Sequence, residues 1–362
     1  MEGPILFLTL NRLSKDSSLL IRKIDKLFLT VLIINLIIVF LLDLPEFLIT
    51  GNPDVISGSY GNNTYQFSML LLICGGYLLG YNYIKKYRTW IIIASQLLIL
   101  MVFYLSQFRA GLPFFILGYI FMIFYIYGKR IVYKLIPIFL LAVIFSAVFS
   151  FFITKEKKLE DLKFDDWIDV VSEPARYLNY GKFKIYRNIP IMWADEPQIF
   201  LIGTGPGNFM SRANYAFSYE LLNYKKGVAI VMQDLLGISY PYFTDLHNKY
   251  IKNNIKPESV FGTWQFSNPY TSYLAAISEI GVIGGVSIII LYFFIILKSI
   301  EFFKIIKEKN KQYIPLGAAL IGSTIYLFGL AFLDNYWEIA RVTLPVWLLF
   351  WVVKSAAYSE SS

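Results

Sequence analysis

Residues 27–44 have the sequence LFLTVLIINLIIVFLLDL, in which Asp43 is the only charged residue. A helix that crosses the roughly 30 Å hydrocarbon core of a bilayer needs about 20 apolar residues, so this stretch predicts a membrane-spanning helix. Seven further apolar stretches of similar length follow, at residues 66–84, 88–106, 109–127, 131–153, 270–297, 313–333 and 336–353. The sequence therefore predicts an all-α, polytopic integral membrane protein with about eight transmembrane helices.

The composition of the 362-residue chain supports the same class. Hydrophobic residues make up 57% of the chain and charged residues only 16%, whereas soluble domains have about 45–50% apolar and about 25% charged residues. The one cysteine, Cys74, and the one histidine, His247, exclude a disulfide-stapled scaffold and a Cys/His zinc or haem site. We expect no metal and no other cofactor.

The basic residues between the predicted spans indicate the orientation, because short loops rich in Lys and Arg stay in the cytoplasm. One side carries 17 Lys and Arg residues against six acidic ones, whereas the short segments on the other side carry only Arg109 and Arg341. Both termini are therefore predicted to be cytoplasmic. The net charge of +8 is then mainly a consequence of orientation. Because the basic residues form no single patch, we expect no nucleic-acid partner.

The predicted spans divide the chain into three regions. These are an N-terminal membrane region of about five helices (1–153), a large, external and mostly helical loop (154–269), and a C-terminal membrane region of about three helices (270–362). An inverted-repeat transporter would have two matching halves, but the sequence has no internal repeat. This asymmetry favours a membrane enzyme whose loop covers an externally facing site.

Arg109, in the turn Phe108-Arg109-Ala110-Gly111, is a candidate site residue at the outer edge between the third and fourth predicted spans. One interpretation is an arginine that extends to the lipid headgroups. The other is a cation that faces a water-filled cavity and meets an anionic group, because a guanidinium pairs bidentately with phosphate oxygens.

Two segments of the external loop carry further candidates. The run Gly203-Thr204-Gly205-Pro206-Gly207-Asn208-Phe209 has glycines at alternate positions, which allow left-handed turns. Such a run either presents N–H groups to an oxyanion or forms a tight corner. The run Gly181-Lys182-Phe183-Lys184-Ile185-Tyr186-Arg187 interleaves cations with aromatics. It predicts either an amphipathic helix on the membrane surface or a cationic rim for a diphosphate or an acidic sugar.

The sixth predicted span begins with a polar stretch, Pro269-Tyr270-Thr271-Ser272. In a helix, Ser272 shares one face with Ala275, Ala276 and Glu279, and the small residues among them permit close packing. Glu279 lies about two turns inside the helix, where a carboxylate must pair with a cation or a hydrogen-bond donor or carry a proton. His247, the single histidine, lies in the external loop and is a further candidate, although a lone loop histidine commonly has no catalytic role.

Taken in order, these features resemble the O-antigen ligase and O-antigen polymerase family of bacterial envelope glycosyltransferases. The shared features are an outer-edge arginine before a glycine, a large external loop late in the chain, the Gly-x-Gly-x-Gly-Asn-Phe run, and a span that continues into Glu-x-Gly-x-x-Gly. In this chain the last motif is Glu279-Ile280-Gly281-Val282-Ile283-Gly284. The resemblance covers about residues 88–353. Members of the family tend to have more spans, so this chain resembles a short member or one truncated at its N-terminus.

The family pattern carries over to this chain with two departures. Arg109 matches the family's outer-edge arginine. The family's Gly-Arg pair, with a Trp four residues after the arginine, falls on Gly181-Lys182 and Tyr186, so lysine replaces arginine and tyrosine replaces tryptophan. The family's His-Asn pair before the sixth span falls on Tyr270-Thr271. Because that histidine is the candidate base in ligases, its replacement favours a repeat-unit polymerase over a lipid A ligase.

The resemblance implies transfer of a glycan from a polyprenyl diphosphate carrier to a sugar hydroxyl at the outer face of a bacterial inner membrane, without a metal or a nucleotide sugar. Fixed cations would stabilise the diphosphate leaving group, and a carboxylate would take the proton of the attacking hydroxyl. We expect catalytic roles for Arg109, Lys182, Tyr270 and Glu279. We expect substrate-binding roles for Arg176, Arg187, Gly203, Gly205, Gly207 and His247.

The expected partners are a polyprenyl-diphosphate-linked oligosaccharide, membrane lipid, and flippase and chain-length regulator proteins. Two other functions stay open at this point. One is a ligase that transfers the glycan to a lipid or protein acceptor, and the other is a transporter of the same lipid-linked sugars. A polymerase would make a ladder of products from purified lipid-linked units, whereas a transporter would move them without chain growth.

Overall fold

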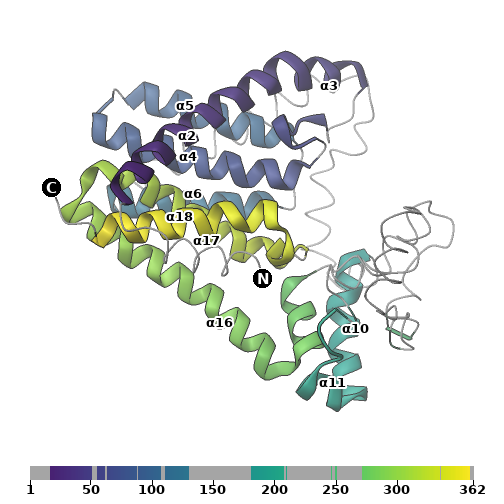
Figure 1. Cartoon of the computed structure of the whole chain (residues 1–362). Helices are drawn as coiled ribbons and strands as arrows, with labels where there is room; N and C mark the ends of the chain where they lie inside the picture. Colours follow the sequence, from purple (N-terminus) through teal and green to yellow (C-terminus); the bar gives the residue numbers. More distant parts are fainter. Residues whose placement is uncertain are drawn as a thin grey trace, which may run out of the picture. The chain divides into compact units, whose positions relative to one another are not determined.

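The computed structural model describes residues 17–50, 55–61, 63–87, 89–106, 111–129, 181–207, 209, 246, 249–250, 271–334 and 336–358. Every regular element in these ranges is a helix and none is a strand, which confirms the all-α prediction (Figure 1). The chain divides into two compact units. The bundle unit comprises Met1–Leu162, Phe293–Leu330 and Ala340–Ser362, and the loop unit comprises Lys163–Tyr292 and Ala331–Ile339.

Apolar helices coincide with seven of the eight predicted spans. Four are long and apolar enough to cross a membrane, namely Leu27–Thr50, Thr64–Lys85, Ser272–Lys309 and Lys311–Leu330. Three shorter apolar helices are Trp90–Leu105, Leu112–Tyr127 and Val342–Tyr358. The predicted span at 131–153 lies outside the described residues. The helices are thus compatible with a membrane protein, and the count of about eight spans stays a prediction.

The first apolar stretch forms α2 (Ser17–Ile38), the π-helical turn η1 (Val39–Asp43) and α3 (Leu44–Thr50). Two of its polar side chains, Asn35 and Asp43, hold the segment that follows α3. The carboxylate of Asp43 accepts the backbone N–H groups of Ser57 and Gly58 at 3.0 and 2.7 Å, and Asn35 Oδ1 accepts the N–H of Ser59 at 2.9 Å. A buried carboxylate is tolerated when donors surround it, so these polar residues position the segment after α3.

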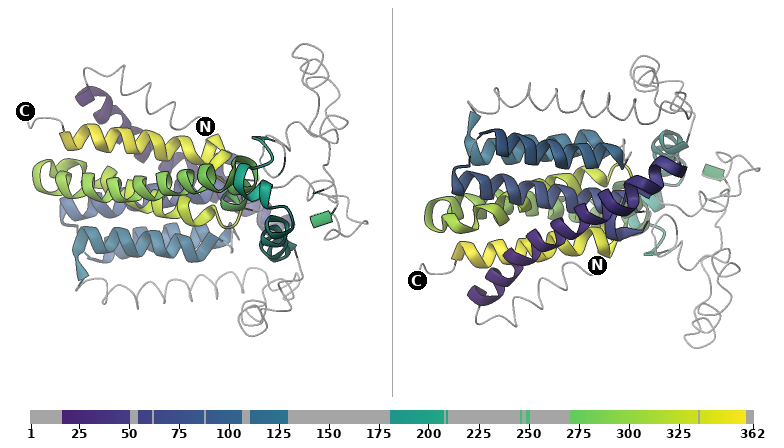
Figure 2. Two further views of the ribbon diagram at one scale, coloured as in Figure 1. Left: turned by 90° about the horizontal axis from the view of Figure 1, so that it is seen from below. Right: turned by 90° about the horizontal axis from the view of Figure 1, so that it is seen from above.

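The centre of the bundle unit is α17 (Ile314–Leu330), which packs against α4 (Thr64–Lys85), α6 (Leu112–Tyr127) and α18 (Ala340–Tyr358). Helix α5 (Thr89–Leu105) follows α4 in the chain and packs against α4. Figure 2 shows these helices running side by side, with α2 inclined across them.

Small residues allow α4 and α17 to approach closely. A Cβ added to Gly76 would lie 2.8 Å from the Cα of Ala319, and one added to Gly80 would lie 2.6 Å from the Cα of Pro315. Close backbone approach of this kind is the usual basis of helix packing within membranes, where no hydrophobic effect draws helices together.

Helix α16 (Ser272–Lys309) differs from the predicted span at 270–297 in two respects. It continues beyond the predicted span through residues 298–309, where Lys298 pairs with Glu301 one helical turn away at 2.7 Å. It is also interrupted at Gly281, whose φ of 75° and ψ of 170° are not helical. The border between the two units falls within α16, after the interruption.

Candidate site in the loop unit

The described part of the loop unit is organised by α10 (Gly181–Asp195) and α11 (Pro197–Ile202). Residues 181–187 form the first part of α10. The apolar side chains of Ile185, Ile189 and Met192 recur at helical spacing, so they lie on one face of α10 and are buried. They share a core with Ile199, Phe209, Tyr250, Leu274 and Ala275. Helix α10 is therefore anchored on the start of α16 and on the loop segments around it.

Polar contacts of three side chains fix the orientation of α10 within this unit. The Asn188 side chain donates to the carbonyl of Tyr250 at 2.8 Å, and Trp193 Nε1 donates to Ser278 Oγ at 3.2 Å. The Tyr186 hydroxyl donates to the carbonyl of Phe332, and burial raises the pKa of that hydroxyl. Pro190 lies inside α10 with an exposed side chain, and it supplies no backbone N–H donor to the helix.

The glycine-rich run 203–209 is bound to α16 where that helix is interrupted. Because Gly281 leaves the helical conformation, carbonyls in the preceding turn lose their helical partners. The N–H of Thr204 donates to the Ser278 carbonyl and the N–H of Gly205 donates to the Glu279 carbonyl, both at 2.9 Å. The interrupted helix therefore offers two acceptors, and the glycine-rich run supplies the donors.

Glycine is required on both sides of this contact. Gly203 has a φ of 84°, and an added Cβ would overlap the carbonyl of Glu279. Gly281 has a φ of 75°, and an added Cβ would overlap the carbonyl of Leu201. Both positions thus need a left-handed backbone and close approach, which only glycine combines without strain.

The side chain of Glu279 binds the same run from the other end. Its Oε2 accepts the N–H of Gly207 at 2.7 Å and its Oε1 accepts the N–H of Phe209 at 3.1 Å. The residue is only 5% exposed, so these donors offset the cost of burying the carboxylate.

The run thus uses its N–H groups inside the protein. The N–H groups of Gly203, Thr204, Gly205, Gly207 and Phe209 all donate to protein acceptors. This pattern favours a tight corner over direct anion binding by the same N–H groups, which were the two interpretations that the sequence left open.

The start of α16 is bound to the segment that follows α17. The N–H of Ser272 and the hydroxyl of Thr271 both donate to the Ala331 carbonyl, at 2.9 and 3.0 Å. The Trp337 N–H in the short helix η9 (Tyr336–Glu338) donates to the Ser272 hydroxyl at 3.3 Å. Of the four residues predicted to share a helical face, Ser272, Ala275 and Glu279 are buried and Ala276 is half-buried.

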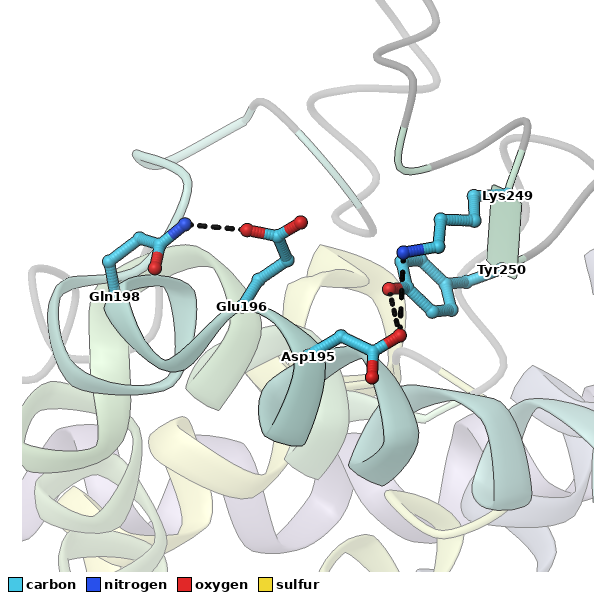
Figure 3. A network of polar contacts seen from close by, with 5 residues as sticks. All are labelled: Asp195, Glu196, Gln198, Lys249 and Tyr250. Carbon is cyan, nitrogen blue, oxygen red and sulfur yellow. Dashed lines mark hydrogen bonds and ion pairs between the residues drawn. The ribbon is translucent and has the colours of Figure 1, made fainter.

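Figure 3 shows a second polar cluster of the loop unit, centred on the exposed carboxylate of Asp195. The Tyr250 hydroxyl donates to Asp195 Oδ2 at 2.6 Å, and Lys249 Nζ lies 3.4 Å from the same oxygen. The hydrogen bond from Tyr250, followed by the bond and charge of Lys249, lowers the pKa of Asp195 below its ordinary value. The carboxylate is therefore ionised at neutral pH. Beside it, the Gln198 side chain donates to Glu196 at 2.6 Å.

The structure describes only some of the predicted site residues. Arg109, Arg176, His247 and Tyr270 lie outside the described residues. Lys182 is in the first turn of α10, with its side chain outside the described part, and Arg187 is exposed on the same helix. Gly203, Gly205, Gly207 and Glu279 are brought together by the hydrogen bonds given above. Their roles in catalysis and substrate binding stay predictions.

Asp195 and Tyr250 were not singled out from the sequence. The only local signal for Asp195 is its position before Glu196 and Pro197, at the junction of α10 and α11. Its partners are more than 50 residues away in the chain, and no local pattern indicates them. Within the described ranges, no group of three or more His, Cys, Asp or Glu side chains is placed to hold a metal ion.

No protein-family model matches the chain, and no curated protein matches it. The resemblance to envelope glycosyltransferases therefore rests on the order and spacing of the motifs.

Proposed function

We propose that this protein is a membrane glycosyltransferase that polymerises the repeat units of a surface polysaccharide. It transfers the growing glycan from a polyprenyl diphosphate carrier to a sugar hydroxyl at the outer membrane face. One observation supports this proposal above others. The glycine-rich run and the Glu279-x-Gly281 motif are both part of the family resemblance and lie about 70 residues apart in the chain. Three hydrogen bonds to Glu279 and one to the preceding Ser278 carbonyl join them within one unit.

Cations predicted to lie on the outer side supply the electrostatic part of the proposed chemistry. Negative charge grows on the diphosphate as the anomeric bond breaks, and fixed cations stabilise that charge more in the transition state than in the ground state. We assign this role to Arg109 and Lys182, assisted by Arg176 and by Arg187 on the exposed face of α10. Loss of one such donor typically lowers the rate about 100- to 1000-fold.

Glu279 fits a positioning role better than the role of general base that the sequence suggested. Both of its carboxylate oxygens accept backbone N–H groups, so its immediate effect is to hold the corner at 203–209 against α16. We propose that this corner keeps the start of α10 at a fixed distance from the start of α16, where Tyr270 orients the acceptor hydroxyl. Asp195, ionised and exposed, is a suitable acceptor for further sugar hydroxyls.

The test in cells uses a strain that lacks its own polymerase. We expect Arg109→Ala to abolish long-chain glycan while protein abundance in the membrane is unchanged. Lys304→Ala, which removes an exposed cation from the bundle unit, is the matched control and should leave chain length unaltered. Persistence of long chains in the Arg109→Ala strain would show that Arg109 is only an interfacial anchor.

A further inference from the structure

A second candidate site lies in the bundle unit, at the end where α4 and α6 finish and α5 and α17 begin. A cavity of about 460 Å³ opens there, a size typical of ligand pockets. Its polar lining includes Asn82, Tyr83, Lys86, Tyr127, Lys307 and Lys311. None of these residues belongs to the loop unit, so the proposed transferase chemistry does not use this cavity.

Three lysines give the cavity its charge, and the described residues that line it include no carboxylate. Lys86 caps α4 in a left-handed conformation, with a φ of 53°, and Lys311 begins the short helix η8 (Lys311–Tyr313). Both are exposed. Lys307 Nζ donates to the carbonyls of Tyr125 and Ile126 at 2.8 and 2.9 Å. These carbonyls lie in the last turn of α6, so two of the three Lys307 donors hold its position, and the third has no acceptor among the residues that the structure describes.

The Tyr127 hydroxyl provides a neutral donor in the same cavity. It is buried and has no hydrogen-bond partner in the described part of the chain. Its ring packs edge to face against Tyr83 at 5.3 Å between centroids, so its position is fixed. A buried hydroxyl without a partner is costly, and an oxygen-rich anion in the cavity would satisfy it.

The surroundings of the cavity match the interface of a membrane. Apolar side chains line its other walls, including Ile92 and Ile314. Tyr87, which also lines the cavity, is 44% exposed, and Trp90, two residues before the lining residue Ile92 in the chain, is 63% exposed. Amphipathic aromatics of this kind are enriched at headgroup depth. The charge rule assigns this end of the helices to the cytoplasmic side, where basic pockets between helices bind anionic headgroups.

We propose that this cavity binds a phosphate group through Lys86, Lys307, Lys311 and the Tyr127 hydroxyl. Two sources carry this chemistry, namely the headgroup of an anionic phospholipid and a soluble phosphate. The cations supply charge-assisted hydrogen bonds, and the tyrosine supplies a further donor.

The test uses the purified full chain in detergent. Binding is measured by native mass spectrometry, and the thermal midpoint is measured with phosphatidylglycerol, phosphatidylcholine or inorganic phosphate added. The test variant is Lys86→Gln with Lys311→Gln. The matched control is Lys85→Gln with Lys309→Gln, which removes the same charge from exposed neighbours that do not line the cavity.

We expect wild type and control to retain phosphatidylglycerol over phosphatidylcholine, and the test variant to bind it about tenfold or more weakly. Tyr127→Phe removes only the hydroxyl and should weaken binding several-fold without altering the fold. If inorganic phosphate stabilises the protein and phosphatidylglycerol adds nothing, a soluble phosphate is the source. Equal binding by the test and control variants, or no preference for either phosphate probe over phosphatidylcholine, would overturn the proposal.

Discussion

The substitution Gly281→Ala tests how the candidate site is built. At a φ of 75° and a ψ of 170°, Gly281 occupies a region that is nearly exclusive to glycine, and an alanine there costs about 1–3 kcal/mol. The added Cβ also overlaps the carbonyl of Leu201. The strain can be relieved only if the run 203–209 moves away from α16 or if α16 straightens.

The hydrogen bonds that would be lost set the scale of the response. The two backbone bonds from Thr204 and Gly205 contribute about 0.5–1.5 kcal/mol each, and the two bonds to Glu279 about 1.5–3 kcal/mol each. Their sum, about 4–9 kcal/mol, exceeds the strain. We therefore expect the run to stay bound in most molecules but to open about 5- to 150-fold more often.

Hydrogen exchange of the peptide that covers residues 203–209 measures this opening directly. In Gly281→Ala we expect its amides to exchange faster by the stated factor. The matched control is Gly284→Ala, because Gly284 lies in the helical part of α16 and the three atoms nearest to its added Cβ all belong to the Ile280 side chain, at 3.1–3.2 Å. Unchanged exchange in Gly281→Ala would refute the inference that this glycine holds the contact.

Three further outcomes follow from the structure. Glu279→Gln places an amide NH₂ group opposite a backbone N–H donor. We expect it to lower the free energy of unfolding by about 1–3 kcal/mol and to lower the thermal midpoint accordingly. An unchanged melting curve would contradict the assigned hydrogen bonds. The lowered pKa of Asp195 means that its ionised form adds stability above its unfolded-state pKa, near 3.8, and that this stability is lost as pH falls through the lower folded-state pKa. The difference in thermal midpoint between wild type and Asp195→Asn should therefore shrink below about pH 4, and a constant difference would argue against the contact. Gly76→Ala pushes a Cβ against the backbone of Ala319 and should destabilise the α4–α17 contact by about 1–3 kcal/mol, as measured by thermal unfolding in detergent, whereas no loss would contradict the close helix packing.

The apolar pattern of the sequence is enough to predict the helices but not their interruptions. A run of apolar residues at 270–297 has a helical pattern throughout, and Gly281 within it looks like any small residue of a packed helix. Its left-handed conformation depends on the run at 203–209, which supplies donors for the freed carbonyls. Such a contact depends on the complementarity of two backbone segments far apart in sequence, so a local sequence pattern does not predict it.

Polar residues show the same limit. Glu279 could be predicted to need donors, because a buried carboxylate needs them, but the donors themselves, Gly207 and Phe209, came only from the structure. The carboxylate of Asp195 gave no signal at all, because its partner Tyr250 lies 55 residues further along the chain. The sequence thus identifies which residue types need partners, and the tertiary structure selects the partners.

The proposed polymerase activity is tested most directly with purified protein and a defined polyprenyl-diphosphate-linked repeat unit, without nucleotide sugar. The account predicts a ladder of lengthening glycans with wild type and none with Arg109→Ala, although the variant remains folded. A folded wild-type protein that makes no ladder, yet moves the lipid-linked unit across the membrane of a vesicle, would contradict the account and identify a transporter.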